Sequence, residues 1–131
     1  MSIYVQDYRV YIEDTDMMGI VYHSNYLKFC ERARTECLRS HGFSLTHLAK
    51  DDTYFAIKHL NIDYQVPAVL DDLLRIETKV MVLGFCQLKF LQSIFRQNHQ
   101  LLAQLEVHVV CVNGKMSPKR LPKELSKEFC A

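Results

Sequence analysis

The sequence predicts an α+β fold in which a five-stranded antiparallel sheet wraps around one long central helix, in the order β-α-β-β-β-β. Residues 26–38 carry apolar side chains at three- and four-residue steps, which is typical of a helix. The later segments alternate apolar and polar residues, as strands do, and mostly short connections between them favour antiparallel pairing. Because the helix and the sheet must each bury an apolar face, the sheet is expected to cover the helix.

The first strand and the long helix account for the N-terminal third of the chain. Residues 3–12 alternate, with Tyr8, Val10 and Ile12 on one face, and form the predicted first strand. Ser24 or Asn25 is expected to cap the long helix, because a short polar side chain accepts hydrogen bonds from first-turn N–H groups. Gly42 fits the helix end, where a left-handed residue is tolerated best when it is glycine.

A short helix and a second strand follow. Ser44 is the expected cap of a helix over residues 44–51. Residues 54–65 form the second predicted strand, whose pattern changes face between Ile57 and Leu60. That change indicates a bulge or burial on both sides, and Pro67 ends the strand.

Three further strands and a tail complete the predicted order. Alternation predicts a third strand over residues 74–82, ended by Gly84, and a fourth over residues 86–96. A polar turn leads to a long fifth strand over residues 101–111, which Asn113 and Gly114 close. The tail from 118 to 129 begins with basic residues and is expected to end in a short helix after Pro122.

Length and composition set the class of protein. The 131 residues are expected to form a single domain, 1–131, with an apolar share of 49% that is ample for a core. A net charge of +1 provides no broad basic surface for nucleic acid. No apolar run approaches the roughly 18 residues of a membrane span, and Asp7, Arg9 and Glu13 interrupt any signal-peptide core. We therefore predict a cytoplasmic protein.

The cysteines and histidines do not indicate a metal or redox centre. The five cysteines include no Cys-x-x-Cys pair, and we expect buried reduced thiols plus an exposed Cys130. The six histidines are not spaced as metal ligands, so no metal site and no cofactor are predicted.

The segment before the long helix is the strongest candidate for chemistry. Asp14 and Asp16 lie in a loop that leads into the N-terminus of the helix. A helix N-terminus has free N–H donors and a partial positive charge, so it can hold an oxygen that gains negative charge. The functional interpretation is a carboxylate next to an oxyanion site; the alternative is that both acids only cap turns and the helix only packs, as acids before helices often do.

The run from Glu13 through Glu36 resembles the signature of the YbgC/4-hydroxybenzoyl-CoA thioesterase family, hotdog-fold enzymes often found with the Tol-Pal genes of bacteria. The matching positions are Asp16, Gly19, Val21, Tyr22, His23, Asn25, Tyr26 and residues 31–34. Weaker similarity in residues 67–72, 106–112 and 118–124 extends the resemblance over nearly the whole chain. Met17 and Met18 stand where the family often has small or polar residues.

The resemblance implies a hotdog fold and an acyl-CoA thioesterase with Asp16 as the catalytic acid of an Asp-x-x-Gly motif. One carboxylate and an oxyanion site can suffice for a thioester, because its leaving thiol has a pKa of about 8.5 and needs little acid assistance. His23 would polarise the thioester oxygen through its backbone N–H, with Gly19 or Val21 nearby. Tyr22 and Asn25 would position the substrate, and Asp14 would fix the loop.

Two other sets of charged residues are candidates for catalysis or for binding coenzyme A. Glu31 is a rival carboxylate, since some hotdog enzymes place the catalytic acid on the central helix; an ion pair with Arg32 or Arg34 is the favoured interpretation. Lys119 and Arg120, with Lys115 and Lys123, would meet the phosphates of coenzyme A, although a solvated tail is an equally good interpretation of the same charges.

Three classes of function follow from these features. The first is hydrolysis of acyl-CoA or of acyl groups on acyl carrier protein. The second is a hotdog hydratase or dehydratase, which would require a His–acid pair placed for proton transfer, and the third is a non-catalytic acyl-binding or scaffold module. Exposed sheet edges, together with the family's interfacial active site, predict a homotetramer built from dimers.

Overall fold

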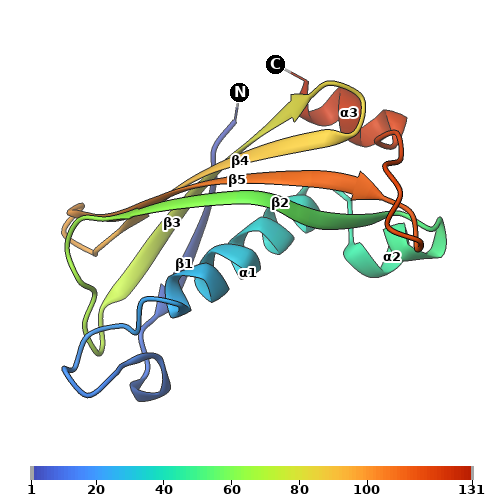
Figure 1. The fold of residues 1–131 in the computed structure, drawn as a ribbon. Helices are drawn as coiled ribbons and strands as arrows, with labels where there is room; N and C mark the ends of the chain where they lie inside the picture. Colours follow the sequence, from blue (N-terminus) through green and yellow to red (C-terminus); the bar gives the residue numbers. More distant parts are fainter. Residues whose placement is uncertain (1, 131) are drawn as a thin grey trace.

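A computed structural model describes residues 2–130 of the chain. The elements in chain order are β1 (Tyr4–Arg9), the 3-10 turn η1 (Ile12–Asp14), α1 (Asn25–Ser40), α2 (Leu45–Lys50), β2 (Tyr54–Tyr64), β3 (Leu73–Leu83), β4 (Gln87–Phe95), β5 (Leu101–Val112) and α3 (Lys123–Phe129). The predicted order of one strand, a long helix and four more strands is confirmed (Figure 1).

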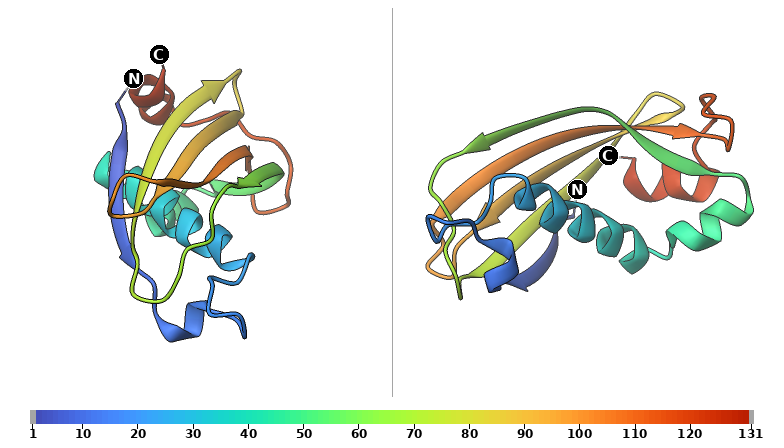
Figure 2. Two further views of the ribbon diagram at one scale, coloured as in Figure 1. Left: turned by 90° about the vertical axis from the view of Figure 1, so that its left-hand side faces the viewer. Right: turned by 60° about the horizontal axis from the view of Figure 1, so that its bottom comes forward.

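All five strands form one antiparallel sheet in the spatial order β1-β3-β4-β5-β2. The sheet curves around α1, which lies against its concave face (Figure 2). Tight turns connect β3, β4 and β5, but β2 and β3 are not neighbours. Residues 65–72 therefore carry the chain from the β2 edge across the end of the sheet to β3, and this crossing passes beside the start of α1.

The core is the interface between α1 and the concave face of the sheet. One face of α1 contributes buried side chains at helical spacing, including Tyr26, Phe29, Cys30, Ala33 and Cys37. The strands supply alternating residues, listed in chain order as Leu74, Ile76, Val80, Leu88, Phe90, Ile94, Leu105, Val107 and Val109. The hydrophobic effect thus fixes α1 across the sheet, and with it the position of the loop that precedes α1.

The ends of α1 differ in how closely they follow prediction. Gly42 adopts a φ of +91° just beyond the helix, as expected, and the N–H of Phe43 returns to the carbonyl of Leu38 at 2.9 Å. The Ser24 cap is not formed: Ser24 has helical dihedrals and its side chain accepts no capping hydrogen bond. The predicted cap of α2 is confirmed, because the Ser44 hydroxyl accepts from the N–H of His47 at 3.1 Å.

The first strand is shorter than predicted. It ends at Arg9, and Ile12, expected on the buried face, is 76% exposed. The physical reason is the acidic loop: the Asp14 carboxylate accepts the N–H of Tyr11 at 2.8 Å and closes η1. The bulge predicted in the second strand is confirmed, since the pairing of β2 with β5 shifts register between Ile57 and His59.

The strand β2 occupies one edge of the sheet and pairs only with β5 among the described residues. It is eleven residues long and carries exposed apolar side chains, with Tyr54 43%, Ile57 55% and Tyr64 48% accessible. A long apolar edge of this kind favours pairing with another strand. None of the helices within residues 2–130 is long and apolar enough to cross a membrane.

Candidate active site

Asp16 begins a tight turn in the loop before α1. The N–H of Gly19 donates to the Asp16 carbonyl at 3.0 Å, and the N–H of Asp16 donates to Ile20 at 2.9 Å. Gly19 has a φ of +78°, a conformation that favours glycine. One carboxylate oxygen of Asp16, Oδ1, accepts the N–H of Met18 at 2.8 Å, whereas Oδ2 has no hydrogen-bond partner within residues 2–130. The turn thus holds the carboxylate by one oxygen and leaves the other for chemistry.

Asp14 has a different role from Asp16. Its two carboxylate oxygens accept from the Tyr11 N–H at 2.8 Å and from the Asn25 side-chain amide at 3.2 Å. Asn25 is 8% exposed and does not line the groove described below, so its amide acts on the loop. Both residues therefore fix the shape of the acid loop around Asp16.

The start of α1 offers one particular backbone donor. The N–H groups of Gly19, Val21 and Tyr22 already donate to Asp16, Ala68 and Asp14 respectively, at 3.0, 2.8 and 2.9 Å. Gly19 and Val21, expected as further donors near the thioester oxygen, therefore have no free N–H in this structure. The N–H groups of His23 and Ser24 make no hydrogen bond within the described residues, and both lie where the helix dipole is positive. Of these two residues only His23 lines the groove described below, so its N–H is the donor in question.

Asp16 and His23 line the same surface groove, of about 380 Å³. The acid loop and α1 provide one wall, made by Asp16, Ile20, Val21, His23 and Tyr26. The end of β2 and the crossing segment provide the other wall, made by Tyr64, Gln65, Val66 and Pro67. The fold thus brings a carboxylate, a helix N-terminus and a largely apolar cleft together.

Two tyrosines that the sequence analysis did not assign to the site join its walls. The Tyr64 hydroxyl donates to the His23 carbonyl at 2.8 Å, and the Tyr26 hydroxyl accepts the N–H of Ala68 at 3.0 Å. Their rings meet edge to face at 5.3 Å. Burial raises the pKa of both hydroxyls, so both stay protonated at neutral pH. In the sequence, the alternation of Leu60, Ile62 and Tyr64 along the second strand was the pattern that could have indicated an inward-facing Tyr64.

Tyr22 lies beside the groove and is not part of its wall. Its side chain is 47% exposed, and its ring lies 4.6 Å from the His23 ring at an angle of 50°. This contact restricts the His23 imidazole, which itself lines the groove. Tyr22 therefore supports His23, and no hydrogen bond joins Tyr22 to Asp16 among the described residues.

Lys119 and Arg120 belong to the segment between β5 and α3, and this segment lies at the opposite end of the sheet from the acid loop (Figure 1). The Lys119 ammonium donates to the carbonyls of Asp51 and Asp52 and to the Thr53 hydroxyl, and so ties the segment after β5 to the end of α2. The Arg120 guanidinium lies 5.5 Å from the centre of the Phe85 ring. Within one chain, neither residue approaches the groove at Asp16.

Glu31 does not form the ion pair expected of it. No cation lies within salt-bridge distance of its carboxylate in the described part of the chain; instead it accepts the Thr35 hydroxyl at 3.3 Å.

The buried thiols are poor nucleophiles, because burial raises the pKa of Cys30 to about 12 and of Cys37 to about 11.

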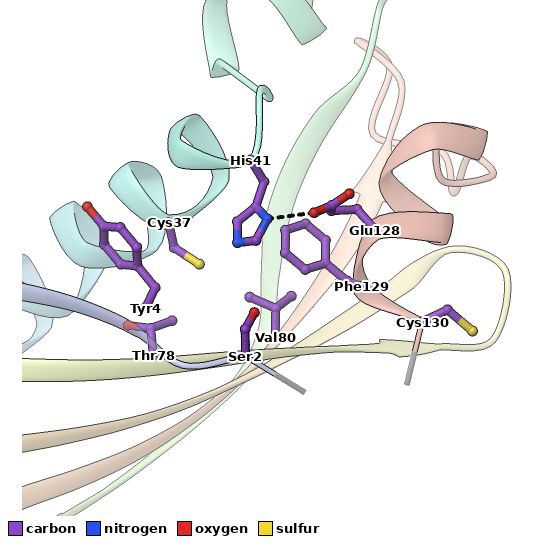
Figure 3. A pocket seen from close by; sticks show the side chains of 9 residues that line it. All are labelled: Ser2, Tyr4, Cys37, His41, Thr78, Val80, Glu128, Phe129 and Cys130. Carbon is purple, nitrogen blue, oxygen red and sulfur yellow. Dashed lines mark hydrogen bonds and ion pairs between the residues drawn. The ribbon is translucent and has the colours of Figure 1, made fainter.

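A second, smaller hollow of about 90 Å³ lies at the other end of α1, against α3 (Figure 3). His41 and Glu128 meet there at 2.8 Å, and the Phe129 ring packs on the imidazole at 4.9 Å. These contacts fasten α3 to the body of the protein.

No group of three or more potential metal ligands was found among residues 2–130.

A five-stranded sheet wrapped around a helix whose N-terminus faces a carboxylate defines the hotdog class of protein, as comparison with solved structures confirms. A probable thioesterase from Bartonella henselae superimposes with a TM-score of 0.88 at 35% identity, over 92% of this chain and 100% of that one. A 1,4-dihydroxy-2-naphthoyl-CoA thioesterase from Synechocystis gives 0.91 at 25% identity, over 98% and 96%.

Sequence relatives narrow the class to a family. The acyl-CoA thioester hydrolase YbgC of Escherichia coli is 45% identical over 122 residues, 92% of this chain and 91% of its own length. The acyl-CoA thioesterase YbgC of Haemophilus influenzae is 47% identical over 123 residues, 92% and 90% of the two chains. Residues 18–103 match the Thioesterase superfamily, and the chain belongs to this family.

Proposed function

We propose that this protein is an acyl-CoA thioesterase, which hydrolyses the thioester of acyl-CoA to a free acid and a thiol. The observation that carries the proposal is that one groove holds two groups without a hydrogen-bond partner in residues 2–130. These are a carboxylate oxygen of Asp16 and the backbone N–H of His23. The thioester carbonyl would place its oxygen at the N-terminus of α1 and its carbon near Asp16.

The reaction needs only these groups and water. As a base, Asp16 takes a proton from water while the water oxygen attacks the carbonyl carbon, and the His23 N–H stabilises the oxyanion. The C–S bond then breaks, and the thiolate takes up the proton. As a nucleophile, Asp16 itself attacks, the C–S bond breaks to leave a mixed anhydride, and water hydrolyses that anhydride.

The deciding experiment is an assay of free thiol release from a panel of acyl-CoAs. A thioesterase releases one thiol and one acid for each substrate consumed. A hydratase would change the acyl group and leave the thioester intact, and an acyl-binding scaffold would bind acyl-CoA without turnover. Absence of thiol release from the whole panel would overturn the proposal.

Replacement of Asp16 tests the chemistry directly. Asp16→Asn keeps the size of the side chain and its Oδ1 acceptor but removes the charge and basicity, so kcat should fall by at least about 100-fold. Acyl-CoA binding should be retained, measurable by calorimetry with the unhydrolysed substrate. Asp7→Asn is the matched control, because Asp7 is exposed on β1, the opposite edge of the sheet from β2.

Two further variants separate the roles within the site. His23→Ala should lower kcat less than Asp16→Asn, because the backbone N–H survives and only the imidazole is lost. Glu31→Gln should remain active. Near-normal turnover of Asp16→Asn together with an inactive Glu31→Gln would assign the chemistry to the acid on α1 instead.

We further propose that the whole chain, 1–131, works as one domain without metal or other cofactor, coenzyme A being part of the substrate. Dialysis against a chelator should leave turnover unchanged. The five free cysteines support a reducing compartment, and we place the enzyme in the cytoplasm.

We propose a homotetramer made of two dimers, with the active site at the dimer interface. The unpaired β2 edge supports the dimer, because two copies can continue one sheet across it. Half-buried apolar residues on the outer sheet face, such as Met81, Leu91 and Val110, support packing of one dimer on another. Sedimentation that shows only monomer at micromolar concentration would contradict this assembly.

Coenzyme A is proposed to lie near Arg120, with acyl carrier protein as an alternative carrier. Arg120 is exposed and has no acidic partner within the described residues. Arg120→Ala should raise KM for acyl-CoA roughly threefold at low salt with little change in kcat, because exposed phosphate contacts are weak and screened. Arg75→Ala on β3 is the control, and an unchanged KM would place the nucleotide elsewhere.

A further inference from the structure

The crossing segment, residues 65–72, is attached to the groups proposed for catalysis through the backbone of Ala68. The Ala68 carbonyl accepts the N–H of Val21 at 2.8 Å, and the Ala68 N–H donates to the Tyr26 hydroxyl at 3.0 Å. Ala68 itself is fully buried. Val21 lies two residues before His23, whose backbone N–H is the proposed oxyanion donor. A movement of Ala68 would therefore also move that donor.

Arg96, the residue that follows β4, holds the crossing segment at two further points. Its Nη2 donates to the Pro67 carbonyl at 2.7 Å, and its Nε donates to Oδ2 of Asp72 at 3.0 Å. The same Oδ2 accepts the N–H of Val69 at 2.9 Å. The turn between β4 and β5, which begins at Arg96, lies at the same end of the sheet as the crossing segment (Figure 1). One guanidinium thus connects this turn to the wall of the groove.

All three nitrogens of the Arg96 guanidinium have an acceptor, because Nη1 donates to the Gln100 side chain at 2.8 Å. A planar set of donors can serve a carbonyl and a carboxylate at the same time, whereas a lysine ammonium on its flexible stem does not reproduce this geometry. The side chains of Arg96 and Asp72 are 19% and 8% exposed, so solvent screens this ion pair less than an open surface pair.

The charges of Arg96 and Asp72 also act on Tyr26, whose side chain lines the groove. Burial is the largest cause that raises the pKa of the Tyr26 hydroxyl; the N–H of Ala68 and the charge of Arg96 lower this pKa, and the charge of Asp72 raises it. The ion pair therefore lies within electrostatic reach of the groove wall, although neither Arg96 nor Asp72 lines the groove.

We propose that Arg96 is a positioning residue for the reaction at Asp16: by fixing the crossing segment, it keeps the His23 N–H in place for the thioester oxygen. This inference rests on the thioesterase function proposed above. Arg96 acts through the backbone of Pro67 and Ala68 and does not touch the substrate. An oxyanion donor stabilises the transition state more than the bound substrate, so its misplacement lowers kcat and leaves KM almost unchanged.

Arg96→Lys separates positioning from charge. The ammonium keeps a positive charge beside Asp72 but cannot also hold the Pro67 carbonyl in the same geometry. The value of kcat should fall at least about tenfold while KM stays within about twofold, because small displacements of a catalytic group are costly to the rate. Arg75→Lys is the matched control, since Arg75 forms an exposed ion pair with Glu77 on β3 and should keep both constants.

Binding without turnover provides a second readout. In the Asp16→Asn background, Arg96→Lys should leave the affinity for acyl-CoA within about twofold in calorimetry, because the positioned donor acts mainly on the transition state. Weaker binding in that double variant, or a raised KM with unchanged kcat in Arg96→Lys, would place Arg96 in substrate binding and overturn the proposal.

Chemical rescue tests whether the guanidinium itself is needed. Arg96→Ala removes the side chain, and millimolar guanidinium chloride should raise its kcat at least about threefold, because a free guanidinium ion can donate to both the carbonyl and the carboxylate. Ammonium chloride should not restore turnover, and Asp16→Asn should stay inactive in guanidinium. The assay is run well below the melting temperature of the variant, so that the folded fraction stays constant and recovered turnover reports on placement.

Failure of this inference is distinguishable from failure of the proposed function. If the wild-type protein releases no thiol from any acyl-CoA, the thioesterase function itself is wrong. If it releases thiol and Arg96→Lys keeps the wild-type kcat, the function stands and the positioning role is wrong. Activity that falls only in step with a lowered melting temperature, and does not recover in guanidinium, would likewise make Arg96 a purely structural residue.

Discussion

Two aspartates only two residues apart have different environments in the acid loop. Asp14 accepts hydrogen bonds with both carboxylate oxygens, whereas Asp16 uses one. A carboxylate held through both oxygens is well suited to fix a backbone, and a carboxylate with a free oxygen is suited to act on a substrate. Both residues are aspartates of the same loop, so the sequence does not distinguish their roles. Their hydrogen-bond partners do.

Tyr64 is the residue whose hydroxyl connects β2 to the start of α1. Tyr64→Phe removes the 2.8 Å hydrogen bond to the His23 carbonyl and keeps the ring against Tyr26. One hydrogen bond of this kind is worth about 1 kcal/mol, so kcat/KM should fall roughly fivefold through looser placement of the His23 N–H. Tyr11→Phe, in an exposed tyrosine of the same loop region, is the control for steady-state kinetics.

At the scale of elements, a buried polar network joins α1 to the sheet. The Gln92 side chain of β4 donates to the Cys30 carbonyl and to the Thr78 hydroxyl, both at 3.0 Å, and accepts from Arg34. Burial lowers the pKa of Arg34, and an arginine guanidinium stays charged in proteins. The hydrogen bonds of this network fix the position of α1 along the sheet, whereas apolar contacts alone would allow the helix to slide along its axis.

Gln92→Leu tests this network. It leaves the Thr78 hydroxyl and the Arg34 guanidinium without their partner in the core, so the free energy of unfolding should fall by at least about 2 kcal/mol. Urea unfolding followed by circular dichroism measures the change. Gln104→Leu, on an exposed position of β5, should change it by less than about 0.5 kcal/mol. Equal effects of the two substitutions would show that the network adds no stability.

At the scale of the whole molecule, the single curved sheet leaves β2 paired with β5 on one side and with no strand of residues 2–130 on the other. A dimer across β2 would pair this edge, bury Tyr54, Ile57 and Tyr64, and place a second subunit beside the groove at Asp16, because Tyr64 lines that groove. Assembly and catalysis are therefore expected to be lost together.

His59→Glu tests the proposed dimer, in which two copies of β2 would pair in antiparallel fashion about a two-fold axis. Because His59 lies at the midpoint of β2, the substitution would set two carboxylates against each other across the axis. Sedimentation should show dissociation at low salt, with partial recovery at high salt as the repulsion is screened. His59→Gln, of similar size and neutral, should keep the wild-type assembly; dissociation of both variants alike would place the axis elsewhere.

Four features could be predicted from the sequence alone: the order of elements, the buried face of α1, the bulge in β2 and the acid loop before the helix. These features depend on spacing of three and four, on alternation and on turn residues, which are local along the chain. The predicted end of the first strand was wrong. Alternation predicted a strand as far as Ile12, but the Asp14 carboxylate accepts the N–H of Tyr11 and turns the chain there.

The tertiary structure alone decided which residues share the groove with Asp16. Tyr64, Gln65 and Val66 reach it because β2 takes the edge of the sheet beside β5 and the chain must cross the sheet end to reach β3. The segment after β5, which contains Lys119 and Arg120, lies at the far end of the sheet beside α2 for the same topological reason. Periodicity shows which face of a strand is buried, but it carries no information on which strands pair, because that choice depends on packing between segments distant in the chain.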